Sequence, residues 1–386
     1  MTLVESSAGA WTNATAQAID ALRVSNPNPR VGCVLVGSAG EPIGQGHTQH
    51  AGGPHAEVMA LRDARAKGHS LIGATAFVTL EPCSHHGRTP PCCDALVEAG
   101  IAKVVVATKD PNPLVAGRGL ARLRAAGIAV ELLPPESDAA HASRELNIGF
   151  FSRMLRGTPW VRMKLAASLD GTSALDNGES QWITGEPART DGHAWRARAC
   201  AVLTGIGTVL QDDPRLDVRL PDTTRQPHLV VVDSALGTPL SARLFEAAPG
   251  DLARQVWIYH AVLDAEKQLA LTERGAKLIH MPGIDNKVDL AAMLQDLAQR
   301  EVNELHVEAG HKLNGSFIRE GLVDELLVYL APKLLGQGAG MSSFGPLQQL
   351  QNSVPLRFLS VDRVGDDLRV LARVQGQDSF LHTPAR

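Results

Sequence analysis

Apolar residues along the first 150 positions follow two patterns, one typical of helices and one typical of buried strands. From Trp11 to Val24 they recur every three or four residues, which predicts a helix with one buried face. Strands are expected at 31–36, 41–44, 75–80, 103–107 and 128–130. Further helices are expected to begin near His55, Cys92 and Leu120. Because strands and helices alternate, the pattern predicts a layered α/β domain with ligands bound at the strand ends.

A second series of strands follows residue 158. These strands are expected at 160–165, 199–204, 228–234, 255–259, 277–280, 304–308 and 326–330, with a hairpin turning at 366–367 and a helix at 289–297. Two glycine-containing loops, 205–208 and 309–316, each lie between a strand and a helix, where free backbone N–H groups can bind an anion. The second loop lacks the Gly-Lys-Ser/Thr ending of a P-loop, which argues against a kinase or ATPase.

The length of 386 residues predicts two domains, because single hydrophobic cores stop growing below this size. Segment 145–157 contains Glu, Phe and Arg and is expected to be a helix that links them. We place the boundary at 157–159 and predict domains at 1–150 and 158–386.

Composition narrows the class of protein. With 44% hydrophobic residues, 20% charged residues and a net charge of -4, the chain is an ordinary globular protein without the basic surface that nucleic acid requires. No apolar run is long enough to span a bilayer, and the N-terminus lacks a secretion signal, so we expect a cytoplasmic protein that acts on no membrane. The five cysteines are an odd number, which favours metal binding over disulfides.

A zinc site is predicted from His55, Cys83 and Cys92. One imidazole and two thiolates leave the fourth tetrahedral position for water, which is the catalytic arrangement. Zinc lowers the pKa of that water to about 7. Glu57 is not expected to bind the metal and is placed to act as the general acid and base. The second Cys follows nine positions after the first, so the loop between them is longer than in the commonest deaminase pattern.

Some residues in this region have two interpretations. Cys93 could compete with Cys92 as ligand, but neighbouring helical residues point about 100° apart, so only one should face the metal and we choose Cys92. Asn28 is either a turn residue between two prolines or an amide directed at the edge of a base. The cysteines taken singly could be small buried apolar residues, an interpretation that the combination with His55 and Glu57 disfavours.

The first half resembles the deaminase half of the bifunctional riboflavin-biosynthesis deaminase-reductase family. The matching motifs are Asn-Pro-x-Val-Gly from Asn28, His-Ala-Glu from His55, Thr-Leu-Glu-Pro-Cys ending at Cys83, and Thr-Pro-Pro-Cys ending at Cys92. The resemblance implies a cytidine-deaminase-like three-layer fold and hydrolytic loss of an amino group from a diaminopyrimidine ribosyl phosphate. It also implies that Asn28 and Arg88 lie near substrate. Relatives tend to have His where this chain has Thr48, between His47 and His50.

The second half resembles the reductase domain of the same family. Lys-Leu-x-x-Ser-Leu-Asp-Gly from Lys164, Glu-Ser-Gln-Trp-Ile-Thr from Glu179 and Val-Glu-Ala-Gly from Val307 stand in family order. The resemblance implies a dihydrofolate-reductase-like fold and hydride transfer from NADPH. The cofactor contacts that it implies are Ala166, Trp182, Thr208, Asp212, Ser234, Gly310, His311, Lys312, Leu313, Asn314, Gly315 and Ser316. The implied substrate contacts are Ser180, Arg196, Leu216, Arg219 and Glu308.

Arg196 and Arg219 suit a 5'-phosphate, because guanidinium groups bind phosphate at two points. Lys164 and Asp170 are the candidates for handling a proton in the reduction. A homo-oligomer with a small-molecule substrate is expected. The rival hypothesis, a nucleic-acid-editing deaminase with a binding module, is disfavoured by 4% aromatic residues and a negative net charge.

Overall fold

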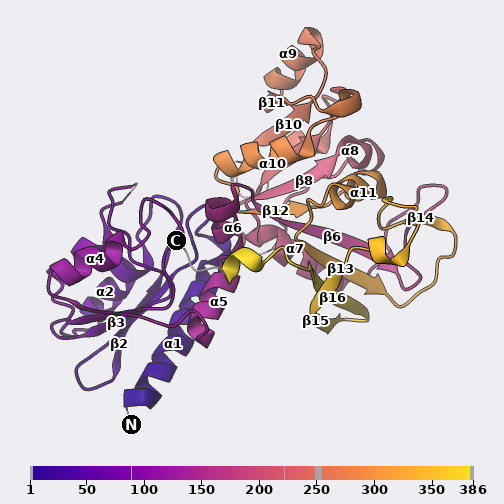
Figure 1. The fold of residues 1–386 in the computed structure, drawn as a ribbon. Coiled ribbons are helices and arrows are strands. Elements are labelled where there is room, and N and C mark those ends of the chain that lie inside the picture. The colour runs from indigo at the N-terminus through magenta and orange to yellow at the C-terminus, as the bar shows by residue number, and fades with distance from the viewer. Residues whose placement is uncertain (1–2, 88, 221, 248–253, 383–386) are drawn as a thin grey trace. The chain divides into compact units, whose positions relative to one another are not determined.

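The computed structural model describes residues 3–87, 89–220, 222–247 and 254–382. It divides into two compact units (Figure 1). The first unit extends to Gly157 and also includes residues 379–382, whereas the second is Thr158–Asp378. The chain end differs from the expected domain 158–386 because the 3₁₀ helix η5 (Ser379–Leu381) packs on helix α6 (Ile148–Arg156), with the Arg156 guanidinium carbon 4.9 Å from the Phe380 ring centroid.

A five-stranded mixed sheet forms the centre of the first unit. Its strands are β1 (Gly32–Val36), β2 (Pro42–His47), β3 (Thr75–Val78), β4 (Lys103–Val106) and β5 (Ala129–Leu132), in the order β2-β1-β3-β4-β5. β1 is antiparallel to both of its neighbours, and β3, β4 and β5 are parallel. The predicted strands are therefore confirmed, with ends that shift by a few residues.

Helices cover both faces of this sheet. They are α1 (Leu3–Asp20), α2 (Ala56–Ala66), α3 (Cys92–Glu98), α4 (Arg118–Ala125), α5 (Asp138–Leu146) and α6 (Ile148–Arg156). Gly32 lets α1 approach one face, since a Cβ there would lie 1.9 Å from the Ala14 carbonyl oxygen. Gly46 lets α2 approach the other face, where a Cβ would lie 2.6 Å from the Ala60 nitrogen. The unit is thus a three-layer α/β/α domain.

The single linking helix expected at 145–157 is wrong, because the chain forms two helices that meet at Asn147. The buried Asn147 amide accepts a hydrogen bond from the Arg30 backbone N–H at 2.7 Å and donates to the Arg30 carbonyl at 3.0 Å. The same amide donates to the Ser143 carbonyl at 3.1 Å, a local side-chain contact of the kind that competes with helix continuation. The pairing with Arg30 joins the end of the unit to the segment before β1.

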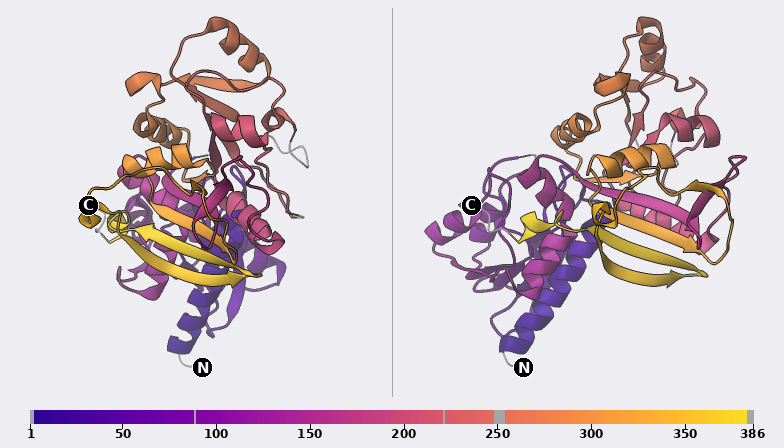
Figure 2. Two further views of the ribbon diagram at one scale, coloured as in Figure 1. Left: turned by 90° about the vertical axis from the view of Figure 1, so that its right-hand side faces the viewer. Right: turned by 45° about the vertical axis from the view of Figure 1, so that its right-hand side comes forward.

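The second unit contains a nine-stranded sheet in the order β11-β10-β9-β8-β12-β6-β13-β16-β15. The strands from β11 to β13 are parallel, and the last two are antiparallel additions. Their bounds are β6 (Trp160–Ser168), β8 (Ala201–Gly205), β9 (His228–Val232), β10 (Val256–His260), β11 (Ala276–His280), β12 (Glu304–Val307), β13 (Glu325–Ala331), β15 (Leu356–Val364) and β16 (Asp367–Val374). Figure 2 shows the long hairpin of β15 and β16 in yellow. A short ladder pairs β7 (Thr172–Leu175) with β14 (Gly338–Gly340).

In the described part of this unit, five α-helices pack around the sheet, namely α7 (Glu186–Arg198), α8 (Ile206–Asp212), α9 (Ala265–Glu273), α10 (Leu290–Gln299) and α11 (His311–Arg319). Alternate residues of β8 enter two apolar clusters, because neighbouring side chains of a strand point to opposite faces. Leu203 packs with residues of α10 and α11, whereas Val202 packs with residues of α8 and α9. No helix in the described part of the chain is both long enough and apolar enough to cross a bilayer.

The loop expected at 309–316 is wrong, because α11 begins at His311 with Gly310 as its N-cap. Asn314 donates a hydrogen bond to the Ala309 carbonyl at 2.9 Å, which fixes the first turn. Gly315 lies inside the helix, where a Cβ would be 2.0 Å from the Ser343 carbonyl oxygen. The glycine thus allows close packing of another segment and does not break the helix.

Candidate functional site

Three metal-binding side chains of the first unit converge on one point. His55 is the N-cap of α2, Cys83 follows β3, and Cys92 is the first residue of α3. One ligand atom from each lies within 4.8 Å of the others. The His55 Nδ1 atom is 3.3 Å from the Cys92 sulfur and 3.6 Å from the Cys83 sulfur. One nitrogen and two sulfurs in this arrangement fit a zinc ion with one coordination position left for water.

Cys93 faces away from this cluster. Its buried sulfur lies 3.5 Å from the Pro82 carbonyl oxygen and 3.6 Å from the Gly119 carbonyl oxygen, both as a weak donor. Because α3 begins at Cys92, the two adjacent cysteines point in different directions. Among the described residues, the cluster therefore includes Cys92 and not Cys93.

The surroundings of Cys83 favour a thiolate. The Cys92 thiol, followed by the His55 ring and the Cys92 backbone N–H, lowers the pKa of Cys83 to about 4. That backbone N–H donates to the Cys83 sulfur at 3.3 Å. The pKa of Cys92 moves upward because its thiol donates to Cys83 and because it is buried. Thiolate is the form that binds metal, so this chemistry fits a zinc site.

Glu57 lies beside the cluster, in the first turn of α2, with 3% of its surface exposed. Burial raises the pKa of its carboxyl, and the Cys83 sulfur adds to the rise, while His55 opposes it. A carboxylate whose pKa is raised is a stronger proton acceptor than an ordinary carboxylate, which suits proton transfer. The position therefore suits a general acid and base.

Glu81 connects the Cys83 loop to the segment 110–120, a role that was not predicted from the sequence. Its buried carboxylate accepts hydrogen bonds from the backbone N–H groups of Asp110, Gly117, Gly119 and Leu120. A Cβ on Gly119 would lie 2.1 Å from the Pro82 carbonyl oxygen, so the two segments are in close contact. The only signal in the sequence is its position directly before Pro82-Cys83.

Of the other residues that the sequence singled out in the deaminase half, Asn28 and Thr48 lie in the described chain and Arg88 does not. Asn28 forms a turn, with its backbone N–H donating to the Ser25 carbonyl at 2.8 Å, and its side chain is half-buried. The Thr48 hydroxyl is buried without a hydrogen-bond partner in the described chain, while the neighbouring His47 ring contacts Gln17. Arg88 lies outside the described residues.

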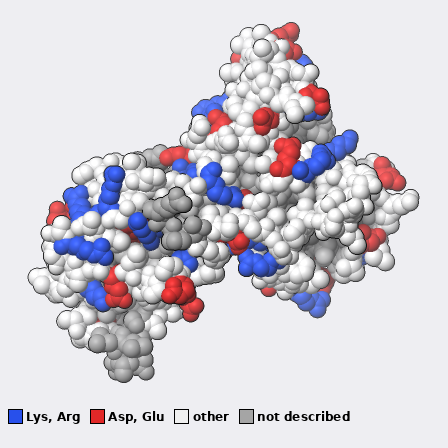
Figure 3. Space-filling view, viewed as in Figure 1, with Lys and Arg blue, Asp and Glu red and all other residues white. Residues whose placement is uncertain are grey.

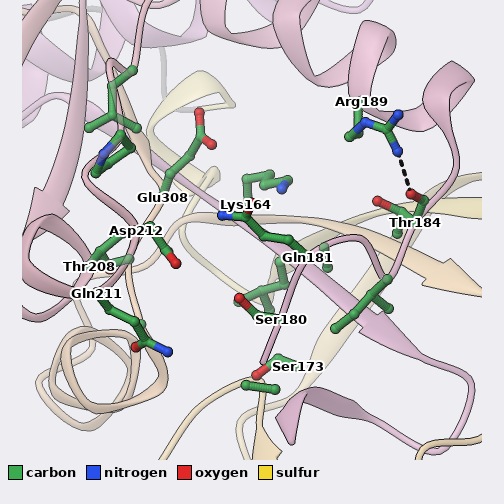
Figure 4. A pocket seen from close by; sticks show the side chains of 18 of the residues that line it. Lys164, Ser173, Ser180, Gln181, Thr184, Arg189, Thr208, Gln211, Asp212 and Glu308 are labelled. Atoms are coloured by element: carbon green, nitrogen blue, oxygen red, sulfur yellow. Dashed lines mark hydrogen bonds between the residues drawn. The ribbon is translucent and has the colours of Figure 1, made fainter. Parts of the chain in front are cut away.

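A pocket of about 560 Å³ lies in the second unit, within the usual range for small-molecule sites. Its walls come from β6, β7, segment 180–184, α7, α8, the segment after α8, the segment after β12 and the start of α11. Figure 4 shows Glu308, Thr208, Gln211 and Asp212 on one side, Arg189 and Thr184 on the other, and Lys164, Gln181, Ser180 and Ser173 between them. Ligands of open α/β sheets bind at this carboxyl edge of the parallel strands.

Most of the residues that the resemblance assigns to cofactor or substrate line this pocket. They are Ala166, Ser180, Trp182, Arg196, Thr208, Asp212, Leu216, Arg219, Glu308, Gly310, His311 and Asn314. Absent from its lining are Ser234, Lys312, Leu313, Gly315 and Ser316. The helical start of α11 explains this division, because only one side of a helix faces the pocket. The Ser234 hydroxyl instead accepts a hydrogen bond from the Val288 N–H at 3.2 Å.

Glu308 is held by a charged partner within the pocket. Arg196 donates to its two carboxylate oxygens at 2.7 and 2.9 Å. Although Glu308 is buried, Arg196 holds its pKa well below the usual range. Lys164 also lines the pocket, and burial lowers its pKa, which Arg196 reinforces and Glu308 opposes.

Asp170 has a structural role in the described chain. Its carboxylate accepts hydrogen bonds from the backbone N–H groups of Leu335 and Gly336 at 3.2 and 2.8 Å. It is absent from the pocket lining, unlike Lys164. Lys164 is therefore the better placed of the two candidates for proton handling.

The pocket also fits a flat, charged cofactor. Trp182 in its lining is 65% exposed, and the lining also includes the small side chains of Ala166 and Ala174. The Asn314 Oδ1 atom is buried without a partner in the described chain, although such atoms are usually hydrogen-bonded. Sequence reasoning missed the cationic lining residues Arg189, Arg215 and Arg243, because isolated arginines in a sequence are usually solvated surface charges.

The metal cluster and the fold around it define the first unit as a zinc-binding deaminase domain of the cytidine deaminase class, joined in this chain to a second α/β domain with its own ligand pocket. Two protein-family models match the two units separately. Residues 10–108 match the cytidine and deoxycytidylate deaminase zinc-binding region, and residues 159–370 match the RibD C-terminal domain. The chain belongs to the RibD family and is a deaminase and reductase of riboflavin biosynthesis.

Relatives match both units together. The riboflavin biosynthesis protein RibD of Escherichia coli K12 is 44% identical over 359 residues, covering 89% of this chain and 93% of that protein. RibD of Aquifex aeolicus is 41% identical over 346 residues, covering 89% and 92%. The Acinetobacter baumannii RibD structure, form 1, has a TM-score of 0.85 at 39% identity and covers 97% of this chain and 100% of that one. A Thermotoga maritima deaminase/reductase structure has a TM-score of 0.81 at 32% identity, covering 95% and 98%.

Proposed function

We propose that the chain catalyses two successive reactions on one pyrimidine. The first unit would deaminate 2,5-diamino-6-(5-phosphoribosylamino)pyrimidin-4-one by hydrolysis. The second would reduce the product, 5-amino-6-(5-phosphoribosylamino)uracil, with NADPH and so convert its ribosyl group to ribityl. The observation that supports this most strongly is the convergence of His55, Cys83 and Cys92 beside the buried Glu57, in the same chain as the family's reductase domain.

In the first reaction, His55, Cys83 and Cys92 would hold the metal. Zinc would supply Lewis acidity and a readily deprotonated water. Glu57 would accept a proton from the attacking water at its carboxylate and return it to the departing amino nitrogen, which leaves as ammonia. Glu81 would hold the Cys83 loop against the segment 110–120 through its four backbone contacts. Asn28 and Arg88 remain our proposed substrate contacts.

In the second reaction, the C1'–O4' bond of the ribosyl group would break, the ring oxygen would take a proton, and the nitrogen lone pair would form a protonated imine at C1'. Bound NADPH would supply the hydride that converts C1' to the ribityl carbon. Lys164 is our candidate proton donor, because it lines the pocket and burial lowers its pKa. Positioning of the two reactants would provide much of the rate.

We assign the ligands of this pocket as the resemblance implies. The cofactor would contact Ala166, Trp182, Thr208, Asp212, Gly310, His311 and Asn314 in the lining, and beyond the lining Ser234, Lys312, Leu313, Gly315 and Ser316. Ser180, Arg196, Leu216, Arg219 and Glu308 would hold the substrate. Because Arg196 already binds Glu308, it would offer a phosphate only its remaining N–H groups.

We also infer a homo-oligomer. β15 is the last strand of its sheet, and Phe358 and Val361 on it are 70% and 56% exposed. An unpaired apolar edge of this kind is suited to pairing with another chain. A cytoplasmic location suits the five free cysteines, which a reducing compartment preserves. Acidic and basic side chains are interspersed on the face shown in Figure 3, so we propose no nucleic-acid partner.

One assay tests both reactions. The purified, zinc-loaded chain is given the diaminopyrimidine phosphate and NADPH, and ammonia release is followed together with the loss of NADPH absorbance. We expect ammonia to appear first and NADPH oxidation to follow in equal amount. Ammonia without NADPH oxidation would contradict the second assignment, and NADPH oxidation without ammonia would contradict the proposed order.

A further inference from the structure

Trp182 and Arg189 form a pair in the wall of the pocket. The Arg189 guanidinium carbon lies 4.7 Å from the centroid of the Trp182 ring, within the range of a cation–π contact. Trp182 is nevertheless 65% exposed, so the contact leaves much of the indole accessible to a ligand. Both residues line the pocket.

The position of Arg189 is fixed by a second contact. Its Nη1 atom donates to the Thr184 carbonyl oxygen at 2.8 Å, as Figure 4 shows. Arg189 also lies in the first turn of α7, where its backbone N–H donates to the Gly185 carbonyl at 3.2 Å. The guanidinium is therefore held beside the indole from two directions.

The charge of Arg189 is not neutralised by the protein. Within the described residues it forms no ion pair with a carboxylate, although other arginines of the lining do. Arg196 pairs with Glu308, while Arg215 and Arg219 both pair with Asp217. A ligand on Trp182 would thus meet an uncompensated positive charge.

We propose that Arg189 makes this platform discriminate between the redox states of the nicotinamide cofactor, an inference that depends on the cofactor assignment made above. The oxidised nicotinamide ring carries a positive charge, whereas the reduced ring is neutral. A cation bound to an indole reduces the attraction of that indole for a second cation, and the two charges also repel each other directly. Arg189 therefore weakens binding of the oxidised form relative to the reduced form and favours its release after hydride transfer.

The test compares the affinities of the full-length chain for the two cofactor forms. Calorimetric titration with NADPH and with NADP+ gives two dissociation constants for the wild type, Arg189→Gln and Arg189→Lys. We expect Arg189→Gln to strengthen NADP+ relative to NADPH by about two- to five-fold, the effect of an exposed cation–π contact. Arg189→Lys, which keeps the charge, should leave this ratio near that of the wild type.

Two outcomes would overturn the inference. Equal changes in both affinities in Arg189→Gln, which leave their ratio unchanged, would indicate a role in structure alone, and two affinities that both stay at their wild-type values would show that the charge has no effect. Tryptophan emission provides a separate check on the cofactor assignment, because Trp182 is the exposed tryptophan of the described chain. If Trp182→Phe binds NADPH with the same emission change as the wild type, the cofactor does not lie on Trp182 and both the assignment and this inference fail.

Discussion

Arg196 and Glu308 form a two-point ion pair, with Nε–Oε1 and Nη2–Oε2 distances of 2.7 and 2.9 Å. Their side chains are only 12% and 14% exposed, so both charges depend on this partnership more than on water. The pair joins α7 to the end of β12, across the wall of the pocket. The ion pair therefore links the stability of the second unit to the shape of its binding site.

Removal of one partner should destabilise the protein. We expect Arg196→Ala to lower the free energy of unfolding of the second unit by about 3–5 kcal/mol, because the mostly buried Glu308 would lose both of its hydrogen bonds to a guanidinium, and only the longer contact with His306 at 3.5 Å would remain. Denaturant unfolding measures this difference. Arg219→Ala is the matched control, since Arg219 is 53% exposed and its ion pair should contribute less than about 1 kcal/mol. Equal losses in the two variants would contradict this interpretation.

His306 should make the second unit sensitive to mild acid. Burial lowers its pKa to about 3, assisted by Arg162, Arg196 and Lys164 and opposed by Glu308. The unfolded chain takes up the proton near pH 6.5 while the folded chain does not, so stability is complete above that pH and falls below it. Between pH 6.5 and 5 we expect this residue to cost about 1–2 kcal/mol of the free energy of unfolding.

Denaturant unfolding of His306→Asn at the two pH values tests this, because the variant lacks the titrating ring. Its loss of stability between pH 6.5 and 5 should be smaller than that of the wild type. His193 and His228, whose pKa values burial lowers to about 4, would still titrate in both proteins. A pH dependence identical in the two proteins would show that His306 takes up a proton in the folded state.

The two adjacent cysteines should differ in their effect on zinc. Cys92→Ser is expected to lower the bound zinc per chain at least several-fold, because it replaces one of two sulfur ligands. Cys93→Ser should keep the metal, since its sulfur contacts the Pro82 and Gly119 carbonyls. Metal analysis after dialysis measures both. Retention of zinc by Cys92→Ser and loss by Cys93→Ser would reverse the ligand assignment.

Glu57→Gln should separate the two activities. Because the amide cannot transfer the proton, we expect deamination to fall by about 10²–10⁴-fold. Zinc content and NADPH-dependent reduction of the deaminated intermediate should stay close to wild-type values, since Glu57 is not a ligand and belongs to the other unit. Loss of both reactions in a folded, zinc-loaded variant would contradict independent sites.

The sequence predicted the sheet strands and the metal cluster well because both depend on local patterns. Apolar runs predict buried strands, and His55, Cys83 and Cys92 each stand at the end of such a run or at the start of a helix. The points at which helices end were harder to predict. Asn147 ends a helix through contacts with Arg30, a residue 117 positions away, and no local rule indicates that partnership.

Contacts between residues far apart in the sequence were also hard to predict in the pocket of the second unit. The motifs brought Trp182, Thr208 and Glu308 to one place, as the structure confirms. They also suggested that Arg196 was free to bind phosphate, yet it is already paired with Glu308, a residue 112 positions away. Pairing between distant charges depends on which strands become neighbours. The order of strands in the sheet decides which charged residues meet, and a single sequence does not reveal this order.

The contacts of Glu81 offer a way to detect metal binding in solution at residues that are not ligands. Its carboxylate accepts hydrogen bonds from the backbone N–H groups of Gly117, Gly119 and Leu120, at the start of α4, and Cys83, our proposed ligand, lies two residues after Glu81. If metal binding makes the loop at Cys83 more rigid, Glu81, two residues away, should also become more rigid. The hydrogen bonds from these backbone N–H groups to Glu81 should then open less often. Slower deuterium uptake at the start of α4 would then mark the loaded protein, at a helix that provides no ligand of its own.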